Sequence, residues 1–547
     1  MIKHVVGSKI LKKEQVLISI LLIAILVLSS GSMVAFAKSN TYIVKPSGDT
    51  SGATDAAAIQ AALNMCTKGG PQCTVQLLAG TYYINSQINV YGFQGSFVGA
   101  GQGQTTIEVP PTVTLPPEAA IYNTPSATAP YWATPPSASN PWPNIFTFVG
   151  GSISISGMTI EDLNPSPVTS YWCYSCGGGY VTNLWIAIQI TGQPSPASPI
   201  PQVSATINQV QVVGTSLPAA TYPPTSWSIS NGIIYGGQFL PSVPPTGWTN
   251  TNIWTDIFPI SGTFSVTNSM FNTVQTGAWA WFTTGAMVAF RSNTLVDNLV
   301  PLGSQDLSKS VVTITGNHMT NIPYDIGVFA IGSDVKPPCT ASVTSDCLLP
   351  STVYVTDNYF QTNWGGSGVI IADFGTPSTL SAVVTGNTVV TDTSCGCYAP
   401  GYPAIGAVYA DVSPTSSSLL VSMNTILGGG GGIALEAGPN SVVIGNQITG
   451  TMAGVVLGCY TVPSDCSAVW GLTSSATGVH VVGNVIKNSA QYGIWVGADS
   501  SNNKITGNFI TGTTSGGYDL YYDGTGTGNV WFGNLCGDHT SSPPGLC

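Results

Sequence analysis

Short stretches of alternating β-forming and small residues recur through the second half of the chain, and each ends in Asn followed by more apolar residues. The shortest steps between these asparagines are 22 to 26 residues, and the longer steps contain extra residues. This pattern predicts the coils of a strand solenoid, because one coil uses a nearly constant length of chain and insertions become loops. The ten repeats end at Asn268, Asn293, Asn317, Asn358, Asn387, Asn424, Asn446, Asn484, Asn508 and Asn534.

The repeated Asn is expected to mark a sharp corner of each coil. Asn tolerates the left-handed backbone region, and its side-chain amide can bond to nearby backbone groups. Identical residues on successive coils can stack as a hydrogen-bonded ladder along the axis. We therefore expect Asn268 to Asn534 to line one common corner.

The chain before these repeats predicts a strand, a helix and the first coils. Thr41–Val44 has strand character, while Ala56–Met65 contains good helix formers and follows the acidic residue Asp55. The first coil of a solenoid needs a cap, because its apolar interior would otherwise contact water. A helix containing Ile59 and Leu63 is expected to supply that cap.

Three N-terminal segments resemble the start of the pectate-lyase-like proteins. They are Asp55–Leu63 (Asp-Ala-Ala-Ala-Ile-Gln-Ala-Ala-Leu), Val75–Ile84 (Val-Gln-Leu-Leu-Ala-Gly-Thr-Tyr-Tyr-Ile) and Val98–Ile107 (Val-Gly-Ala-Gly-Gln-Gly-Gln-Thr-Thr-Ile). The later repeats resemble the coils of the same superfamily. The resemblance implies an all-β fold, a right-handed parallel β-helix solenoid over residues 38–547. It implies little about chemistry, because the superfamily includes lyases, hydrolases, epimerases, phage tailspikes and non-catalytic surface proteins.

Two Pro-rich stretches are predicted to be long loops inserted between coils. They cover about residues 110–145 and 194–260. Proline cannot donate a ladder hydrogen bond, so such stretches are poor candidates for sheet strands. A small separate domain within one insertion is the alternative.

Residues 1–37 have the features of a secretory signal peptide. Lys3, Lys9, Lys12 and Lys13 precede an apolar run over 16–28, and Ala35-Phe-Ala37 resembles a cleavage site. An uncleaved membrane anchor is the alternative. No other stretch is apolar enough to cross a bilayer, so we expect a secreted protein.

The twelve cysteines fit an oxidising compartment. Four pairs close in sequence are predicted to form local disulfides: Cys66 with Cys73, Cys339 with Cys347, Cys459 with Cys466, and Cys536 with Cys547. Cys173, Cys176, Cys395 and Cys397 are predicted to form disulfides, within or between their two motifs. A four-thiolate metal site is the alternative for these four.

The charge balance excludes several classes of partner. The formal net charge is −11, charged residues make up 6% of the chain, and Arg291 is the single arginine. Proteins that bind nucleic acid or anionic lipid need clustered Lys and Arg. Neither nucleic acid nor a membrane beyond the N-terminal segment is therefore expected as a partner.

Acidic residues follow three consecutive strands, of which each begins at or near a Gly. These acids are Asp373, Asp411 and Glu436. If the strands are in register, equivalent positions lie ~4.8 Å apart and the three acids form a row. Crowding raises the pKa of one carboxyl, which provides a general acid beside a base or nucleophile, as glycoside hydrolysis requires. A calcium site and solvated turn residues are the alternatives.

Aromatic residues in or beside expected loops are candidates for sugar binding, because sugar rings stack on aromatic faces. They are Trp172, Tyr174, Trp279, Trp281, Trp364 and Tyr402. The alternative is that these rings pack the loops against the solenoid.

Taken together, these features predict a secreted, carbohydrate-active protein. The favoured activity is hydrolysis of a neutral or weakly acidic polysaccharide with no cofactor, although calcium remains an alternative. The competing function is a non-catalytic surface or adhesion scaffold that binds glycans. The segments characteristic of galacturonan hydrolases and of alginate epimerases are absent. A polysaccharide lyase is less favoured, because there are few cations to neutralise the carboxylate of a uronate.

Overall fold

The computed structural model contains two compact units, residues 1–40 and 41–547, and the second unit contains the strands and helix described below. The expected signal segment lies outside the described residues. The structure describes residues 40–68, 72–110, 144–163, 185–192, 200–216, 228–236, 238–239, 257–323, 326–332, 349–363, 366–373, 380–391, 403–409, 418–436, 441–458, 475–497, 499–537 and 541–547.

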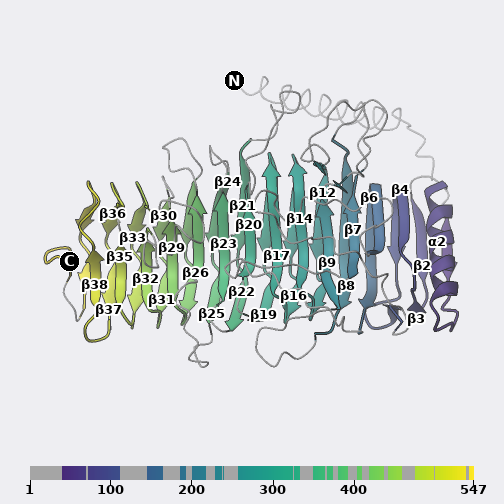
Figure 1. Cartoon of the computed structure of the whole chain (residues 1–547), viewed down its shortest axis with the longest axis horizontal. Helices are drawn as coiled ribbons and strands as arrows, with labels where there is room; N and C mark the ends of the chain where they lie inside the picture. The colour runs from purple at the N-terminus through teal and green to yellow at the C-terminus, as the bar shows by residue number, and fades with distance from the viewer. Residues whose placement is uncertain are drawn as a thin grey trace, which may run out of the picture. The chain divides into compact units, whose positions relative to one another are not determined.

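The second unit is a solenoid in which each coil contributes strands to three parallel stacks (Figure 1). The first stack precedes the repeated Asn. It contains β1 (Thr41–Val44), β2 (Cys73–Leu77), parts of β4 (Ile88–Val98), β6 (Asn144–Glu161) and β8 (Val203–Val213), then β12 (Thr263–Thr267), β15 (Met287–Arg291), β18 (Val311–Thr315), β21 (Ser351–Thr356), β24 (Leu380–Thr385), β27 (Leu419–Ser422), β30 (Val442–Ile444), β33 (His480–Val482), β36 (Lys504–Thr506) and β39 (Val530–Phe532).

The second stack follows the Asn. It contains β3 (Gly80–Tyr83), β5 (Thr105–Glu108), the last parts of β6 and β8, then β13 (Met270–Asn272), β16 (Thr294–Val296), β19 (His318–Pro323), β22 (Tyr359–Asn363), β25 (Thr388–Thr391), β28 (Thr425–Leu427), β31 (Gln447–Thr449), β34 (Val485–Lys487), β37 (Phe509–Thr511) and β40 (Leu535–Cys536).

The third stack completes each coil. It contains the first parts of β4 and β6, then β7 (Trp185–Thr191), β9 (Ile229–Gly236), β14 (Thr276–Thr284), β17 (Val300–Ser308), β20 (Ile326–Ile331), β23 (Ser367–Asp373), β26 (Pro403–Tyr409), β29 (Gly431–Glu436), β32 (Ala453–Leu457), β35 (Tyr492–Val496) and β38 (Tyr518–Tyr522). Parallel pairing between successive coils confirms the predicted parallel β-helix.

A helix covers the first coil, as the sequence predicts. This helix, α2 (Ala53–Lys68), lies at the purple end of the solenoid in Figure 1. Ile59 and Leu63 are fully buried and belong to the same apolar core as the strands. Asp55 accepts hydrogen bonds from the backbone N–H of Ser47 (2.8 Å) and of Tyr83 (3.0 Å), so it ties the helix to β3.

The predicted Asn ladder is present at the corner between the first and second stacks. It runs from Asn293 to Asn534, and each ladder residue is buried. Asn446 is a typical example: its Nδ2 donates both to Oδ1 of Asn484 (2.9 Å) and to the carbonyl of Val421 (3.0 Å). The ladder therefore satisfies backbone groups that the sharp corner leaves without sheet partners.

Two details of this corner differ from the prediction. Ser269, not Asn268, occupies the ladder position on β12's coil, because the N–H of Ser269 donates to Oδ1 of Asn293. Asn268 has a positive φ of 50° instead. The left-handed residue is thus the one before the ladder position, and Gly316 (φ 63°) is another example. These residues make the turn, while the ladder side chains bond across the coils.

The second predicted insertion, 194–260, is partly wrong. Strands β8 and β9 lie inside this range and pair in register with their neighbours on both sides. The prolines flank these strands rather than interrupt them, so an uninterrupted run such as Val203–Val213 can join the stacks. A short antiparallel pair, β10 (Gln238–Phe239) and β11 (Ile257–Phe258), also lies here. Most of the first insertion, residues 111–143, lies outside the described residues.

Glycines recur at the start of the third-stack strands for a steric reason. A Cβ at Gly432 would lie 2.8 Å from Cγ2 of Ile448, and one at Gly454 would lie 2.5 Å from Cγ2 of Ile486. These isoleucines belong to the second stack and fill the interior. Glycine therefore avoids a clash at these two positions, where side chains from the second stack reach the backbone of the third.

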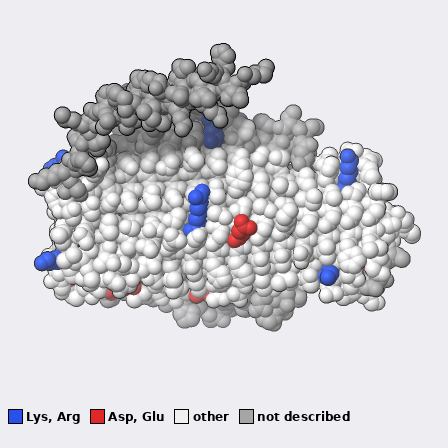
Figure 2. All heavy atoms as spheres, turned by 180° about the vertical axis from the view of Figure 1, so that it is seen from behind, with Lys and Arg blue, Asp and Glu red and all other residues white. Residues whose placement is uncertain are grey.

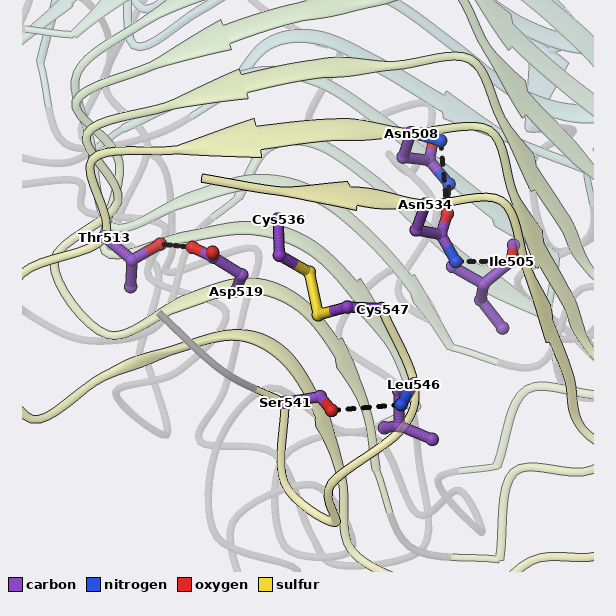
Figure 3. Close-up of a disulfide and its surroundings, with 9 residues drawn as sticks. All are labelled: Ile505, Asn508, Thr513, Asp519, Asn534, Cys536, Ser541, Leu546 and Cys547. Carbon is purple, nitrogen blue, oxygen red and sulfur yellow. Dashed lines mark hydrogen bonds between the residues drawn. A yellow bond between two sulfur atoms is a disulfide. The ribbon is translucent and has the colours of Figure 1, made fainter. Parts of the chain in front are cut away.

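Two predicted disulfides are confirmed: Cys66–Cys73 near α2 and Cys536–Cys547 at the other end. Figure 3 shows the second one beside the last ladder residues, Asn508 and Asn534. Leu546 packs against the core, and its N–H donates to Oγ of Ser541 (3.0 Å). The last residues therefore cover part of the final coil.

The other eight cysteines lie outside the described residues. Within the described part of the chain, no helix combines the length and apolarity needed to cross a membrane.

Candidate functional site

The described residues of the predicted site all lie on strands of the third stack. Strand pairing defines one outward row of side chains, which we call the outer row. It contains Ile234, Trp279, Gly303, Phe329, Ile370, Gly406, Ala434, Val456, Trp495 and Tyr521. This row is mostly apolar, and residues on either side of it in sequence point into the solenoid.

Asp373, one of the three predicted acids, lies at the end of β23 and is fully buried. Its partner on the next coil is Tyr409, which is also buried. Oδ2 of Asp373 accepts a hydrogen bond of 2.8 Å from the N–H of Leu380. Burial and the nearby Asp373 charge both raise the pKa of Tyr409. Asp373 thus holds the chain where it leaves β23.

Glu436, the second described acid, lies at the end of β29 and is partly buried. Its neighbour Leu435 belongs to the main core, whereas Ala434 belongs to a small apolar cluster outside it. Side chains alternate along a strand, so the Glu436 side chain lies on the outer side. Burial raises its pKa from the ordinary 4.5 to about 7.

These two acids do not form the row that the sequence predicts. Glu436 pairs with Val408, and Val408 pairs with Ala372, which is one residue before Asp373. An offset of one residue places a side chain on the opposite face of a strand. Asp373 therefore points inward and Glu436 outward. The third acid, Asp411, lies outside the described residues.

Two of the six predicted aromatic residues, Trp279 and Trp281, are described, and both lie on β14. The Trp279 ring covers Gly303 on the next coil, where a Cβ would lie 2.2 Å from Cζ3. The same ring also contacts Phe329 edge-on, with centroids 6.4 Å apart. Trp281 stacks on Phe282 at 4.9 Å. Trp279 is thus packed into an outer apolar cluster, while Trp172, Tyr174, Trp364 and Tyr402 lie outside the described residues.

Four aromatic residues that were not predicted from the sequence as site residues gather on β35 and β38. We call Tyr492, Trp495, Tyr518 and Tyr521 the aromatic cluster. Centroid distances are 5.2 Å from Tyr492 to Trp495, 4.9 Å from Tyr492 to Tyr521 and 5.7 Å from Tyr518 to Tyr521. All four side chains are partly exposed. Their signal was a Tyr followed three residues later by Trp or Tyr on consecutive coils.

A further pair of carboxyls lies on the second stack, far along the chain from Glu436. Glu108 and Glu161 are direct partners on neighbouring strands. Burial raises the pKa of both, and the charge of Glu108 adds to the effect on Glu161. Among the described residues, no group of three or more His, Cys, Asp or Glu is arranged to hold a metal ion.

Comparisons with known proteins agree with this architecture. Residues 347–534 match the family model described as a right handed beta helix region. The fold of the chain is therefore a right-handed parallel β-helix. The matched segment includes Asp373, Glu436 and Trp495 of this β-helix protein. No curated protein sequence matches the chain.

Several solved structures match the chain at low identity. The surface adhesin PfbA of Streptococcus pneumoniae is 15% identical, with 74% of this chain and 88% of that chain covered and a TM-score of 0.41. Tailspike protein 3 of bacteriophage CBA120 is 12% identical, with 86% and 57% covered and a TM-score of 0.43. The A-module of a mannuronan C-5 epimerase from Azotobacter vinelandii is 14% identical, with 90% and 96% covered and a TM-score of 0.38. These scores are too low to transfer a site or an activity.

Proposed function

We propose that this β-helix protein is a secreted polysaccharide hydrolase that uses Glu436 as its general acid. The supporting observation is the position of Glu436: an outward, partly buried carboxyl whose pKa burial raises to about 7. A general acid works best when its pKa lies near the working pH, because it is then both protonated and able to donate. An ordinary exposed glutamate would be ionised at neutral pH.

Hydrolysis of a glycosidic bond needs a second carboxylate opposite the acid. In the proposed reaction, Glu436 donates its proton to the oxygen of the leaving sugar. A partner carboxylate either activates water or attacks the anomeric carbon. Asp411 is the proposed partner, because it follows β26, the strand next to β29. Asp373 is unsuited to this role, because its side chain is fully buried and bonded to Leu380.

The charge distribution supports a neutral or weakly acidic substrate. Strands β29, β32, β35 and β38 contain no Lys or Arg. The face seen in Figure 2 carries only isolated basic and acidic groups among the described residues. A strongly acidic glycan would need several cations to offset the loss of its hydration. Secretion is supported by the N-terminal segment and by the two disulfides, since disulfides persist in oxidising compartments.

The test is a panel of polysaccharides assayed both for new reducing ends and for unsaturated products. Wild type is compared with Glu436→Gln, Asp411→Asn and Asp373→Asn. We expect Glu436→Gln to lower kcat by ~10²–10⁴-fold, as loss of general acid catalysis does. Asp373→Asn is the matched control, because Asn keeps an oxygen that can accept from Leu380. Equal activity in Glu436→Gln and wild type contradicts the proposal, and unsaturated products identify a lyase instead.

A further inference from the structure

The aromatic cluster on β35 and β38 has the arrangement of a fixed platform. Tyr492 and Trp495 pack against Ala434, Ala453 and Val456, which lie on β29 and β32. These small residues support the rings from the solenoid side and leave part of each ring exposed. Trp495 also contacts Tyr521 on the next coil, at a centroid distance of 6.2 Å. The four rings therefore hold one another in place across two coils.

The cluster also carries three phenol hydroxyl groups, on Tyr492, Tyr518 and Tyr521. Burial raises the pKa of Tyr492, and the neighbouring phenols of Tyr521 and Tyr518 add to this effect. Phenol hydroxyls can both donate and accept hydrogen bonds. The cluster thus combines apolar ring faces with several polar groups, which suits a ligand with C–H faces and hydroxyl edges.

The cluster lies on the same side of the third stack as Glu436. Trp495 follows Ala434 and Val456 in the outer row, and Ala434 is two residues before Glu436. Strand β35 is two strands beyond β29, so the offset along the axis is ~10 Å at the usual strand spacing. The lateral offset of two residues adds roughly 7 Å along the strand. A sugar chain that runs along the axis would cross both places.

We propose that the aromatic cluster is a binding subsite for an uncharged glycan chain, which stacks on Trp495, Tyr518 and Tyr521 and extends toward Glu436. This inference rests on the proposed function for its catalytic end, but the platform itself depends only on the rings. The nearest acid on β38, Asp519, is buried and accepts from the hydroxyl of Thr513 (Figure 3). Strand β35 contains no charged residue. It therefore offers no cation to pair with a uronate and no anion that would need a cationic ligand, which favours a neutral sugar.

The experiment measures binding separately from hydrolysis. Binding of the same polysaccharide panel is measured in the Glu436→Gln background, by calorimetry for soluble glycans and by pull-down for insoluble ones. Trp495→Ala and Tyr521→Ala are each compared with Tyr354→Ala, a control ring that is 39% exposed on the first stack. We expect each cluster variant to weaken binding by about 3- to 10-fold, in line with the loss of one ring contact. Tyr354→Ala should bind as its parent does.

A structural effect is separated from a binding effect by Trp495→Phe. This variant keeps an aromatic face, so it should restore most of the affinity lost in Trp495→Ala. Thermal melting of all variants identifies any that fail to fold. Unchanged affinity in folded Trp495→Ala and Tyr521→Ala overturns the subsite, and so does an equal loss in Tyr354→Ala.

The outcomes also distinguish this inference from the proposed function. Loss of binding in the cluster variants, together with full hydrolysis by Glu436→Gln, supports the subsite and overturns the catalytic assignment. Loss of hydrolysis in Glu436→Gln with unchanged binding in the cluster variants supports the catalytic assignment and overturns the subsite. Glycan binding that depends on the cluster without any hydrolysis supports the subsite on a non-catalytic scaffold. Absence of binding to every glycan overturns the subsite.

Discussion

Asp373 and Glu436 end two strands of the same parallel stack, yet their side chains lie on opposite sides of it. Asp373 is fully buried and bonds the N–H of Leu380, whereas Glu436 lies outward beside a small apolar cluster. Their positions differ by one residue in register. The first acid is therefore a structural group, whereas the second is an outward carboxyl whose pKa burial raises.

The free energy of unfolding is expected to fall as pH rises from about 4.5 to about 7. Burial raises the pKa of Glu436 to about 7 in the folded state. The folded state therefore binds more protons than the unfolded state in this window, so deprotonation favours unfolding. One such group gives a slope of at most about 1.4 kcal/mol per pH unit. When the free energy of unfolding is measured with urea at several pH values in this range, it should depend less steeply on pH in Glu436→Gln than in wild type.

We expect some pH dependence of the unfolding free energy to remain in Glu436→Gln. Glu108 and Glu161 have raised pKa values for the same reason, and they change stability in the same direction. Replacing both with Gln in the Glu436→Gln background should flatten the profile further. A slope unaffected by Glu436→Gln would show that this carboxyl titrates alike in both states.

Removal of one ladder side chain is expected to destabilise the solenoid strongly. Oδ1 of Asn446 accepts from the N–H and the Nδ2 of Asn424, and its own Nδ2 donates to Asn484 and Val421. In Asn446→Ala these buried groups lose their partners, at a cost of ~1–3 kcal/mol for each one left unsatisfied. Urea unfolding should show a loss of at least about 2 kcal/mol.

The control for the ladder is Asn268→Gly. Asn268 is outside the ladder and has a positive φ of 50°, which Gly adopts without strain. Its effect should stay within ~0.5 kcal/mol. Equal losses in the two variants would show that the ladder contributes no more than an exposed turn residue.

The ladder also shows why the fold was predictable from the sequence. Its residues recur once per coil, so a periodic signal survives several insertions. The same signal failed by one position at Asn268, because on that coil a Ser, Ser269, occupies the ladder position and the preceding residue is an Asn. Strands β8 and β9 were missed, because the surrounding prolines hid an otherwise regular alternation.

The site was less predictable, because it depends on register rather than on composition. A carboxyl at a strand end changes face with a shift of one residue, and the loop lengths around Asp373 and Glu436 do not define that shift. The aromatic cluster was not predicted from the sequence for a related reason. Tyr492 and Trp495 lie on a strand, and only the pairing with Tyr518 and Tyr521 shows that the four rings meet.

A side chain at the glycine positions of the third stack is expected to disrupt packing. In Gly432→Val, the new Cβ would lie 2.3 Å from the carbonyl oxygen of Gly454 and 2.8 Å from Ile448. Such overpacking typically costs ~1–3 kcal/mol. Ala404 occupies the equivalent position on the preceding coil, so Ala404→Gly is the matched control. It should cost about 1 to 2 kcal/mol, because Gly adds backbone entropy to the unfolded chain and removes one buried methyl group. A Gly432→Val variant as stable as wild type in urea would contradict the steric explanation for this glycine.

The disulfide at the end of the chain is expected to stabilise the last coil. Cys536–Cys547 closes a segment of 11 residues and holds Leu546 against the core, while Ser542 accepts from the N–H of Tyr522 (2.9 Å). The double variant Cys536→Ser/Cys547→Ser loses this constraint, which for a loop of this length is worth about 2–3 kcal/mol. Its melting temperature should fall, and hydrogen exchange at Tyr522 and Ser542 should accelerate more than exchange near α2. The corresponding variant of Cys66–Cys73 is the control, because it should give the opposite pattern along the chain. Unchanged exchange at both ends would show that neither bond anchors its terminal coil.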